Sequence, residues 1–239
     1  IGGVAAKIRG ATRRDCKIVG VPQGNAKGVN DILVLKGVEP LCDIQIFTMK
    51  DIEQARAISN KNKDETVTST LADFKLVADL IREEGADSLK NSKVQEKLEG
   101  VLEKMPNHQS AQLLLDYGKG KAPKRLSVGG SFHEIDSNAS GVFRLTSGMV
   151  RQENYDHSQQ TIDEATSALE ELEKLEKIVD SRFEDYIQSA IKLCRLIEEG
   201  KGDDDEEVFL KRLQNRWESL QSQSEKLRKD PEVREEIMG

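Results

Sequence analysis

The residues best suited to chemistry stand near the start of the sequence, in IGGVAAKIRGA. Gly2 and Gly3 let the backbone enter a helix tightly, and Lys7 follows in its first turn. A lysine acts as a general base only when its amine is neutral, and burial in an apolar pocket lowers the pKa of a lysine. The neighbouring Val, Ala and Ile residues permit such burial. By itself this pattern is weak, because a lysine in such a position is usually solvated.

Other candidate residues lack partners at a useful spacing. Ser131 has glycines before it in VGGSF, but we expect it to be an ordinary loop serine. HEIDS contains His133 and Glu134 without a second histidine four residues after the first, which argues against a zinc site. We expect His108 and His157 to lie at helix starts without a ligand role. GKGKAPKR lacks the spacing of a phosphate-binding loop. We therefore expect no metal and no cofactor in this chain.

Composition limits the class of protein. Of the 239 residues, 36% are hydrophobic, 33% are charged and only 4% are aromatic, which favours long solvated helices. The net charge of −7 argues against nucleic acid as a partner, and no apolar run is long enough for a membrane span. The three cysteines are far apart and form no CxxC pair, so we expect reduced, mostly buried thiols and a cytoplasmic location.

Residues 1–58 have the sequence pattern of an α/β fragment. A helix over Val4–Arg14, a strand over Lys17–Pro22, a helix capped by Asn25, a strand over Asp43–Thr48 and a helix after Asp51 follow in order. A crossover of this length implies that the two strands are parallel. Two parallel strands leave faces and edges uncovered, so we expect this fragment to be part of a larger sheet.

The rest of the chain has helical patterns. We expect a linker over 59–70, a helical pair resembling one tetratricopeptide unit over 71–120, and a loop-rich connection over 121–156. Over 157–239 we expect a long antiparallel helical hairpin. Its first helix would carry one apolar stripe from Ile162 to Ile197, and its second would bury Trp217 against that stripe.

The order of motifs in residues 1–58 resembles the C-terminal portion of the proteolytic domain of bacterial Lon-type peptidases. The resemblance rests on GGV, a lysine on the next helix, IVGVP, an asparagine soon after, DIQIFT and DIEQARAI. It implies that Lys7 is the lysine of a Ser–Lys dyad and that the serine lies upstream, outside this chain. It also implies hydrolysis of peptide bonds in protein or peptide substrates, assembly into a homo-oligomer, and dependence on ATP only where an ATPase module precedes the domain.

A second reading belongs to another class of protein. The helical pair and the long hairpin could bind partner proteins, in a non-catalytic interaction module that keeps a remnant of the peptidase fold. Lys7 would then have no catalytic role. The Lon-type family ordinarily ends soon after its proteolytic domain, whereas about 180 residues follow the matching part here, and this departure keeps the second reading open.

Overall fold

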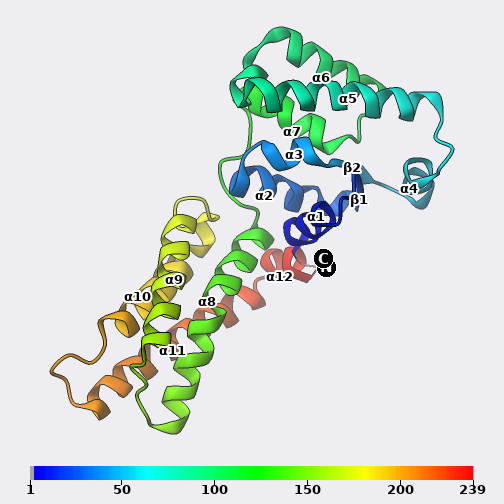
Figure 1. The fold of residues 1–239 in the computed structure, drawn as a ribbon. Helices are drawn as coiled ribbons and strands as arrows, with labels where there is room; N and C mark the ends of the chain where they lie inside the picture. Colours follow the sequence, from blue (N-terminus) through cyan, green and yellow to red (C-terminus); the bar gives the residue numbers. More distant parts are fainter. Residues whose placement is uncertain (1–2, 239) are drawn as a thin grey trace. The chain divides into compact units, whose positions relative to one another are not determined.

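A computed structural model describes residues 3–238, and its contacts divide the chain into two compact units. One unit comprises Gly3–Leu126 and the other begins at Ser127. The described residues are mostly helical and contain one small sheet of two parallel strands (Figure 1). The expected combination of a parallel strand pair and a mainly helical remainder is thus confirmed.

The first unit begins with the expected alternation of helices and strands. Asp51 caps the last of these helices by accepting a hydrogen bond from the amide of Gln54 at 2.9 Å. Ile52 of that helix is 75% exposed, whereas Ile58 is buried. The elements are α1 (Val4–Arg13), β1 (Ile18–Pro22), η1 (Gln23–Asn25), α2 (Ala26–Lys36), α3 (Glu39–Asp43), β2 (Gln45–Met49) and α4 (Ile52–Ser59).

Residues after the sheet cover its β2 edge, which was predicted to be uncovered. The Ser110 hydroxyl accepts from the amide of Ile46 at 2.9 Å and donates to the carbonyl of Ile44 at 3.0 Å. Asn107 pairs with Thr48 in both directions, through its carbonyl (2.9 Å) and its side-chain amide (2.9 Å). The start of a helix therefore occupies the place of a third strand on this side.

Four further helical elements complete the first unit: α5 (Glu65–Glu84), η2 (Ala86–Lys90), α6 (Ser92–Lys104) and α7 (Gln109–Gly118). The predicted helical pair corresponds to α6 and α7, and Ala111 is fully buried. Phe74 of α5 and Leu114 of α7 belong to the same hydrophobic core as Ile46 of β2. The predicted domain boundary at residue 58 is therefore wrong, because one core joins the sheet and these helices.

The predicted linker over 59–70 is also too long. Asp64 caps α5 by accepting from the amide of Val67 at 2.7 Å, and Val67 and Thr70 are buried. The polar residues before Asp64 have no apolar period from which the start of the helix could be predicted. In the structure, the buried face of α5 determines where this helix begins.

The second unit contains a bundle of four helices and a short fifth helix. They are α8 (Val128–Gln152), α9 (Gln159–Leu175), α10 (Glu184–Glu199), α11 (Glu206–Lys229) and α12 (Pro231–Met238), with the turn η3 (Ser181–Phe183) before α10. Contacts link α8 to α9, α9 to α10, α10 to α11 and α11 back to α8, so the four long helices close a ring (Figure 1). Asp205 caps α11, as the acidic run before this helix suggests.

The expected loop-rich connection over 121–156 is wrong. Residues 128–152 form α8, which Ser127 caps by accepting from the amide of Gly130 at 3.0 Å. Buried residues recur along α8 every three or four positions, including Phe132, Ile135 and Val142. This buried face outweighs the cost of glycine in a helix, which is about 1 kcal/mol per residue.

The long hairpin expected over 157–239 is not confirmed. Its first helix is divided, because α9 ends at Leu175 and α10 begins at Glu184, and the two halves pack against each other. The apolar period runs through the break at Val179 and Phe183, which are both buried. Trp217, expected in the core, is only partly buried, whereas Phe209 is fully buried and Leu220 nearly so.

No helix among residues 3–238 combines the length and the apolar character that a membrane crossing requires.

The burial of His108 makes the stability of the first unit depend on pH. Burial lowers the pKa of His108 from 6.5 to about 3. Between these two pH values His108 is protonated in the unfolded chain and neutral in the folded chain. Stability is therefore lost as the pH falls from 6.5 toward 3. The free energy of unfolding of the wild type, measured with urea, should fall by up to about 1.4 kcal/mol per pH unit relative to that of His108→Asn. This variant keeps a capping side chain but does not titrate. Parallel pH profiles of the two proteins would contradict this.

The aromatic residues of α11 should differ in their contribution to stability. We expect Phe209→Ala to cost about 3–5 kcal/mol by leaving a cavity, and Trp217→Ala to cost clearly less because the indole is partly exposed. Denaturant unfolding of both variants checks the order. The reverse order would show that the packing of α11 is described incorrectly.

Candidate functional site

Lys7 lies in the first turn of α1, as expected. Gly3 precedes the helix with φ 74°, in the left-handed region that favours glycine, and its carbonyl accepts from the amide of Lys7 at 3.0 Å. The start of α1 packs closely against α2. A Cβ atom added to Gly28 would lie only 2.9 Å from the Cβ atom of Val4. Gly2, the other member of the glycine pair, lies outside the described residues.

The side chain of Lys7 is exposed. Ala5 and Ile8 are buried and fix the inner face of α1, so Ala6 and Lys7 lie on the outer face. The apolar burial that a lysine base needs is therefore not supplied by residues 3–238. If Lys7 acts as a base, another segment or molecule must cover this face.

A second cation, Arg14 at the C-terminal cap of α1, lies on the same outer face and was not predicted from the sequence. Arg14 follows Lys7 by seven residues, which is nearly two full helical turns, and both side chains are exposed. Gly10 lies between them, and a Cβ atom added there would meet no atom within 4 Å. The seven-residue spacing on an expected helix was the signal available in the sequence.

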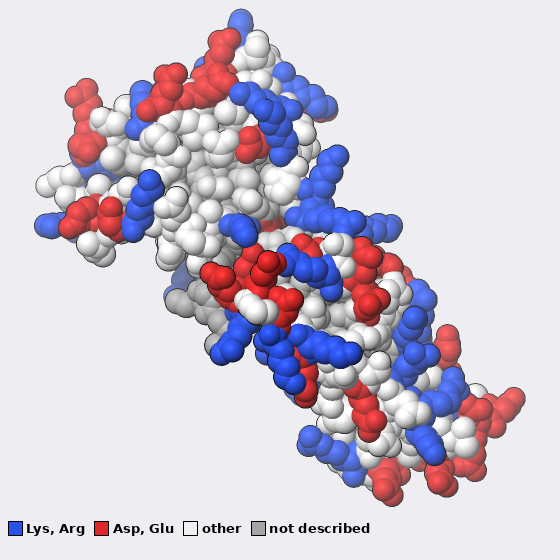
Figure 2. Space-filling model, turned by 180° about the vertical axis from the view of Figure 1, so that it is seen from behind, with Lys and Arg blue, Asp and Glu red and all other residues white. Residues whose placement is uncertain are grey.

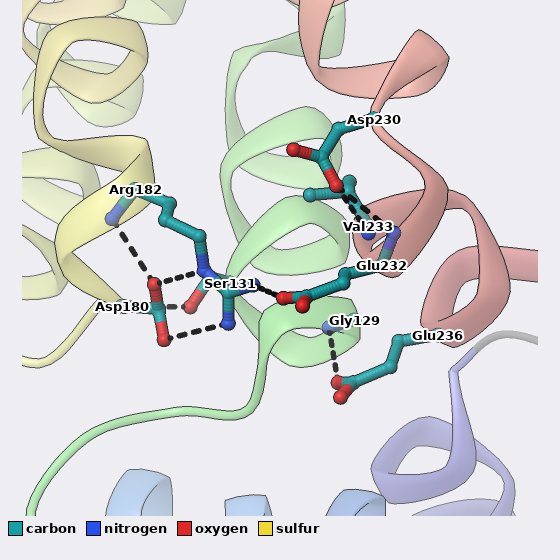
Figure 3. Close-up of polar contacts among 8 residues, drawn as sticks. All are labelled: Gly129, Ser131, Asp180, Arg182, Asp230, Glu232, Val233 and Glu236. Atoms are coloured by element: carbon teal, nitrogen blue, oxygen red, sulfur yellow. Dashed lines mark hydrogen bonds and ion pairs between the residues drawn. The ribbon is translucent and has the colours of Figure 1, made fainter.

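Ser131 is not a loop serine and has a structural role. It lies in α8, is fully buried, and its hydroxyl accepts from the backbone amide of Asp180 at 2.9 Å (Figure 3). That amide lies at the break between α9 and α10, so the hydroxyl satisfies a backbone group near the helix interruption. The hydrogen bond links α8 to this break. A backbone amide cannot act as a general base, so this contact does not activate the Ser131 hydroxyl.

The charged residues around Ser131 also hold helix ends together. Arg182 pairs with Asp180 at 2.9 Å and with Glu232 of α12 at 2.8 Å. Glu236 accepts from the amide of Gly129 at 3.3 Å, in the first turn of α8, where a negative charge is favourable (Figure 3). This cluster explains how α12 is attached to α8.

Two histidines have partners that explain their positions. His108 caps α7: its Nδ1 accepts from the amide of Ala111 at 3.2 Å, and its Nε2 donates to the side-chain oxygen of Gln45 at 3.1 Å. His157 precedes α9, and its Nδ1 accepts from the hydroxyl of Tyr155 at 2.6 Å. Within residues 3–238 there is no group of three or more His, Cys, Asp or Glu side chains that could hold a metal ion.

The cysteines are free thiols, and two of the three are buried. Burial raises the pKa of Cys42 and of Cys194 to about 12, so neither forms a thiolate near neutral pH. Cys16 is exposed just after α1.

A surface cavity of about 370 Å³ lies beside the second half of α8 and the start of α9. Its lining includes Arg144, Leu145, Met149, Asp156 and Glu164. None of the residues singled out from the sequence lines it.

His133, also on α8, is half-buried, and burial lowers its pKa.

Acidic and basic side chains are mixed over the face shown in Figure 2. Comparison of the chain with protein-family models, with curated proteins and with solved structures gives no match.

The structural role of Ser131 leads to a stability prediction. We expect Ser131→Ala to cost about 1–3 kcal/mol, because the amide of Asp180 loses its acceptor. Ser140→Ala is the matched control, since Ser140 is exposed on the same helix and bonds only within it. Equal urea midpoints for the two variants would show that the buried hydrogen bond contributes nothing.

Proposed function

We propose that residues 1–58 are the C-terminal part of a Lon-like serine peptidase domain, with Lys7 as the base of a Ser–Lys dyad. The nucleophilic serine is supplied by residues outside the 239 of this sequence. The observation that carries the proposal is the order of motifs around Lys7. It is supported by an element order of helix, strand, helix, strand and helix over α1, β1, α2, β2 and α4.

The outer face of α1 is accessible to the segment that this proposal requires. Lys7 is exposed opposite the buried Ala5 and Ile8, so its amine is open to a segment that carries the serine. Contact with that segment would remove water from the amine and favour the neutral form that accepts a proton. The serine oxygen would then attack the peptide carbonyl, the C–N bond would break, and the amine would leave with the proton that Lys7 took from the serine. Water would hydrolyse the resulting acyl-enzyme and regenerate the serine hydroxyl.

The sheet has one side on which it could be extended. The amide of Gln45 donates to the carbonyl of Lys17, so in a parallel ladder Val19 and Val21 direct their backbone groups toward β2. The amides and carbonyls of Ile18 and Gly20 then point to the other side, where no strand lies within the described residues. We propose that the remaining strands of the peptidase domain pair along this β1 edge.

The setting of the peptidase is proposed from the resemblance. Substrates would be proteins or peptides, the assembly a homo-oligomer and the location cytoplasmic, with no nucleic acid or membrane as partner. No metal or other cofactor takes part in a Ser–Lys mechanism. ATP would be needed only where an ATPase module precedes the domain.

A second candidate function is a non-catalytic protein-interaction module with a remnant of the peptidase fold. The exposure of Lys7 and the helical bundle after Ser127 favour it. The two candidates differ in whether a serine-bearing segment covers α1.

The 239-residue chain should have no peptidase activity of its own, because the resemblance places the nucleophilic serine upstream of the glycine pair, outside this sequence. We expect no release of fluorescent peptides from labelled, unfolded casein above a buffer blank. Turnover that disappears in Lys7→Ala would overturn this expectation and place the nucleophile within the chain.

In the longer polypeptide that includes the serine, Lys7→Arg should be as inactive as Lys7→Ala. A guanidinium stays protonated, so it keeps the charge of the lysine but cannot accept a proton. We expect the activity of both variants to fall at least about a hundredfold, the usual contribution of a general base. Arg13→Ala, on another side of α1, is the control for stability. Near-normal activity of the Lys7→Arg protein would show that Lys7 is not the general base.

A further inference from the structure

Two exposed, positively charged side chains lie on the outer face of α1. Lys7 and Arg14 are exposed, and neither has an ion-pair partner among residues 3–238. The nearest acid in sequence, Asp15, pairs with Lys17 at 2.6 Å. α1 itself contains no acidic residue. An anion that approaches Arg14 along this face therefore meets no competing carboxylate of the helix.

The spacing of these cations matches an extended peptide. Arg14 is the C-cap residue that directly follows α1. The helical rise over these seven positions places its Cα atom about 10 Å beyond that of Lys7 along the axis and about 20° from it around the axis. An extended chain covers about 3.3–3.6 Å per residue, so this distance corresponds to three residues. Gly10, three residues after Lys7, has no side chain and leaves the surface between the two cations open.

We propose that this face selects polypeptide substrates that carry an aspartate or glutamate about three residues from the bond that is cleaved, with Arg14 as the residue that binds the carboxylate. The inference rests on the proposed function, because Lys7 marks the position of the reacting bond. A guanidinium suits this role since it binds a carboxylate through two parallel hydrogen bonds.

Arg13 provides a matched control. It has the same side chain, is exposed, and lies next to Arg14, but it is about 120° from Lys7 around the helix. Both arginines interact favourably with the carboxyl end of α1, so their removal should cost similar stability. A difference between Arg13→Ala and Arg14→Ala therefore reports on the face that holds Lys7.

The first experiment measures binding to the 239-residue chain and needs no serine. Fluorescein-labelled peptides that contain one Glu, or Gln at the same position, are titrated at low salt and followed by anisotropy. We expect the Glu peptide to bind about tenfold more tightly, the effect of one charged hydrogen bond. This preference should be lost in Arg14→Ala and kept in Arg13→Ala and Lys7→Ala. Equal binding of both peptides, or equal loss in both arginine variants, would overturn the proposal.

The second experiment uses the longer polypeptide with its serine and a set of fluorogenic peptides in which one Glu is moved along the sequence. We expect kcat/KM to be highest with Glu three residues from the cleaved bond, and this maximum to disappear in Arg14→Ala while the all-Gln peptide is still cleaved. Cleavage that depends on Lys7 but not on the Glu position would overturn the inference and leave the proposed function intact. Binding that depends on Arg14 without any cleavage would reject the peptidase and retain acidic-peptide recognition.

Discussion

The first unit depends on how the backbone of β2 is satisfied on the side away from β1. A strand in the interior of a protein must pair its amides and carbonyls, and here the partners are the start of α7 and the residues before it. Ser110, Asn107 and His108 each form a hydrogen bond with a residue of β2. Because these contacts join residues about sixty positions apart, they bind the α/β fragment and the following helices into one core.

This coverage leaves the sheet asymmetric. One side is closed by backbone and side-chain groups that no additional strand could displace without loss of these hydrogen bonds. The other side, along β1, has no strand partner among residues 3–238. Pro22, which has no amide proton, limits how far a strand could continue on that side. The proposed peptidase domain and the non-catalytic module differ in what occupies this edge and the nearby face of α1.

In the second unit the corresponding constraint is a helix break. The apolar period between Ile162 and Ile197 continues without interruption, yet the chain turns between α9 and α10. The turn is stable because its polar groups find partners: Asp180 caps η3, and its amide donates to Ser131 of α8. Two helices of ordinary length can then pack in a closed bundle, in which each buries its stripe against two neighbours.

The sequence by itself determined the local elements wherever periodicity and caps agreed. The parallel strands, α1 with Lys7, α4 after Asp51, and α6 and α7 on either side of Pro106 were all predicted. Only the tertiary structure decided three other features: that α8 is a helix despite its glycines and serines, that the long stripe is divided, and that Lys7 is exposed. The reason is physical, because helix packing offsets a poor local propensity, a remote hydroxyl stabilises a turn, and exposure depends on what covers a face. None of these can be read from neighbouring residues in the chain.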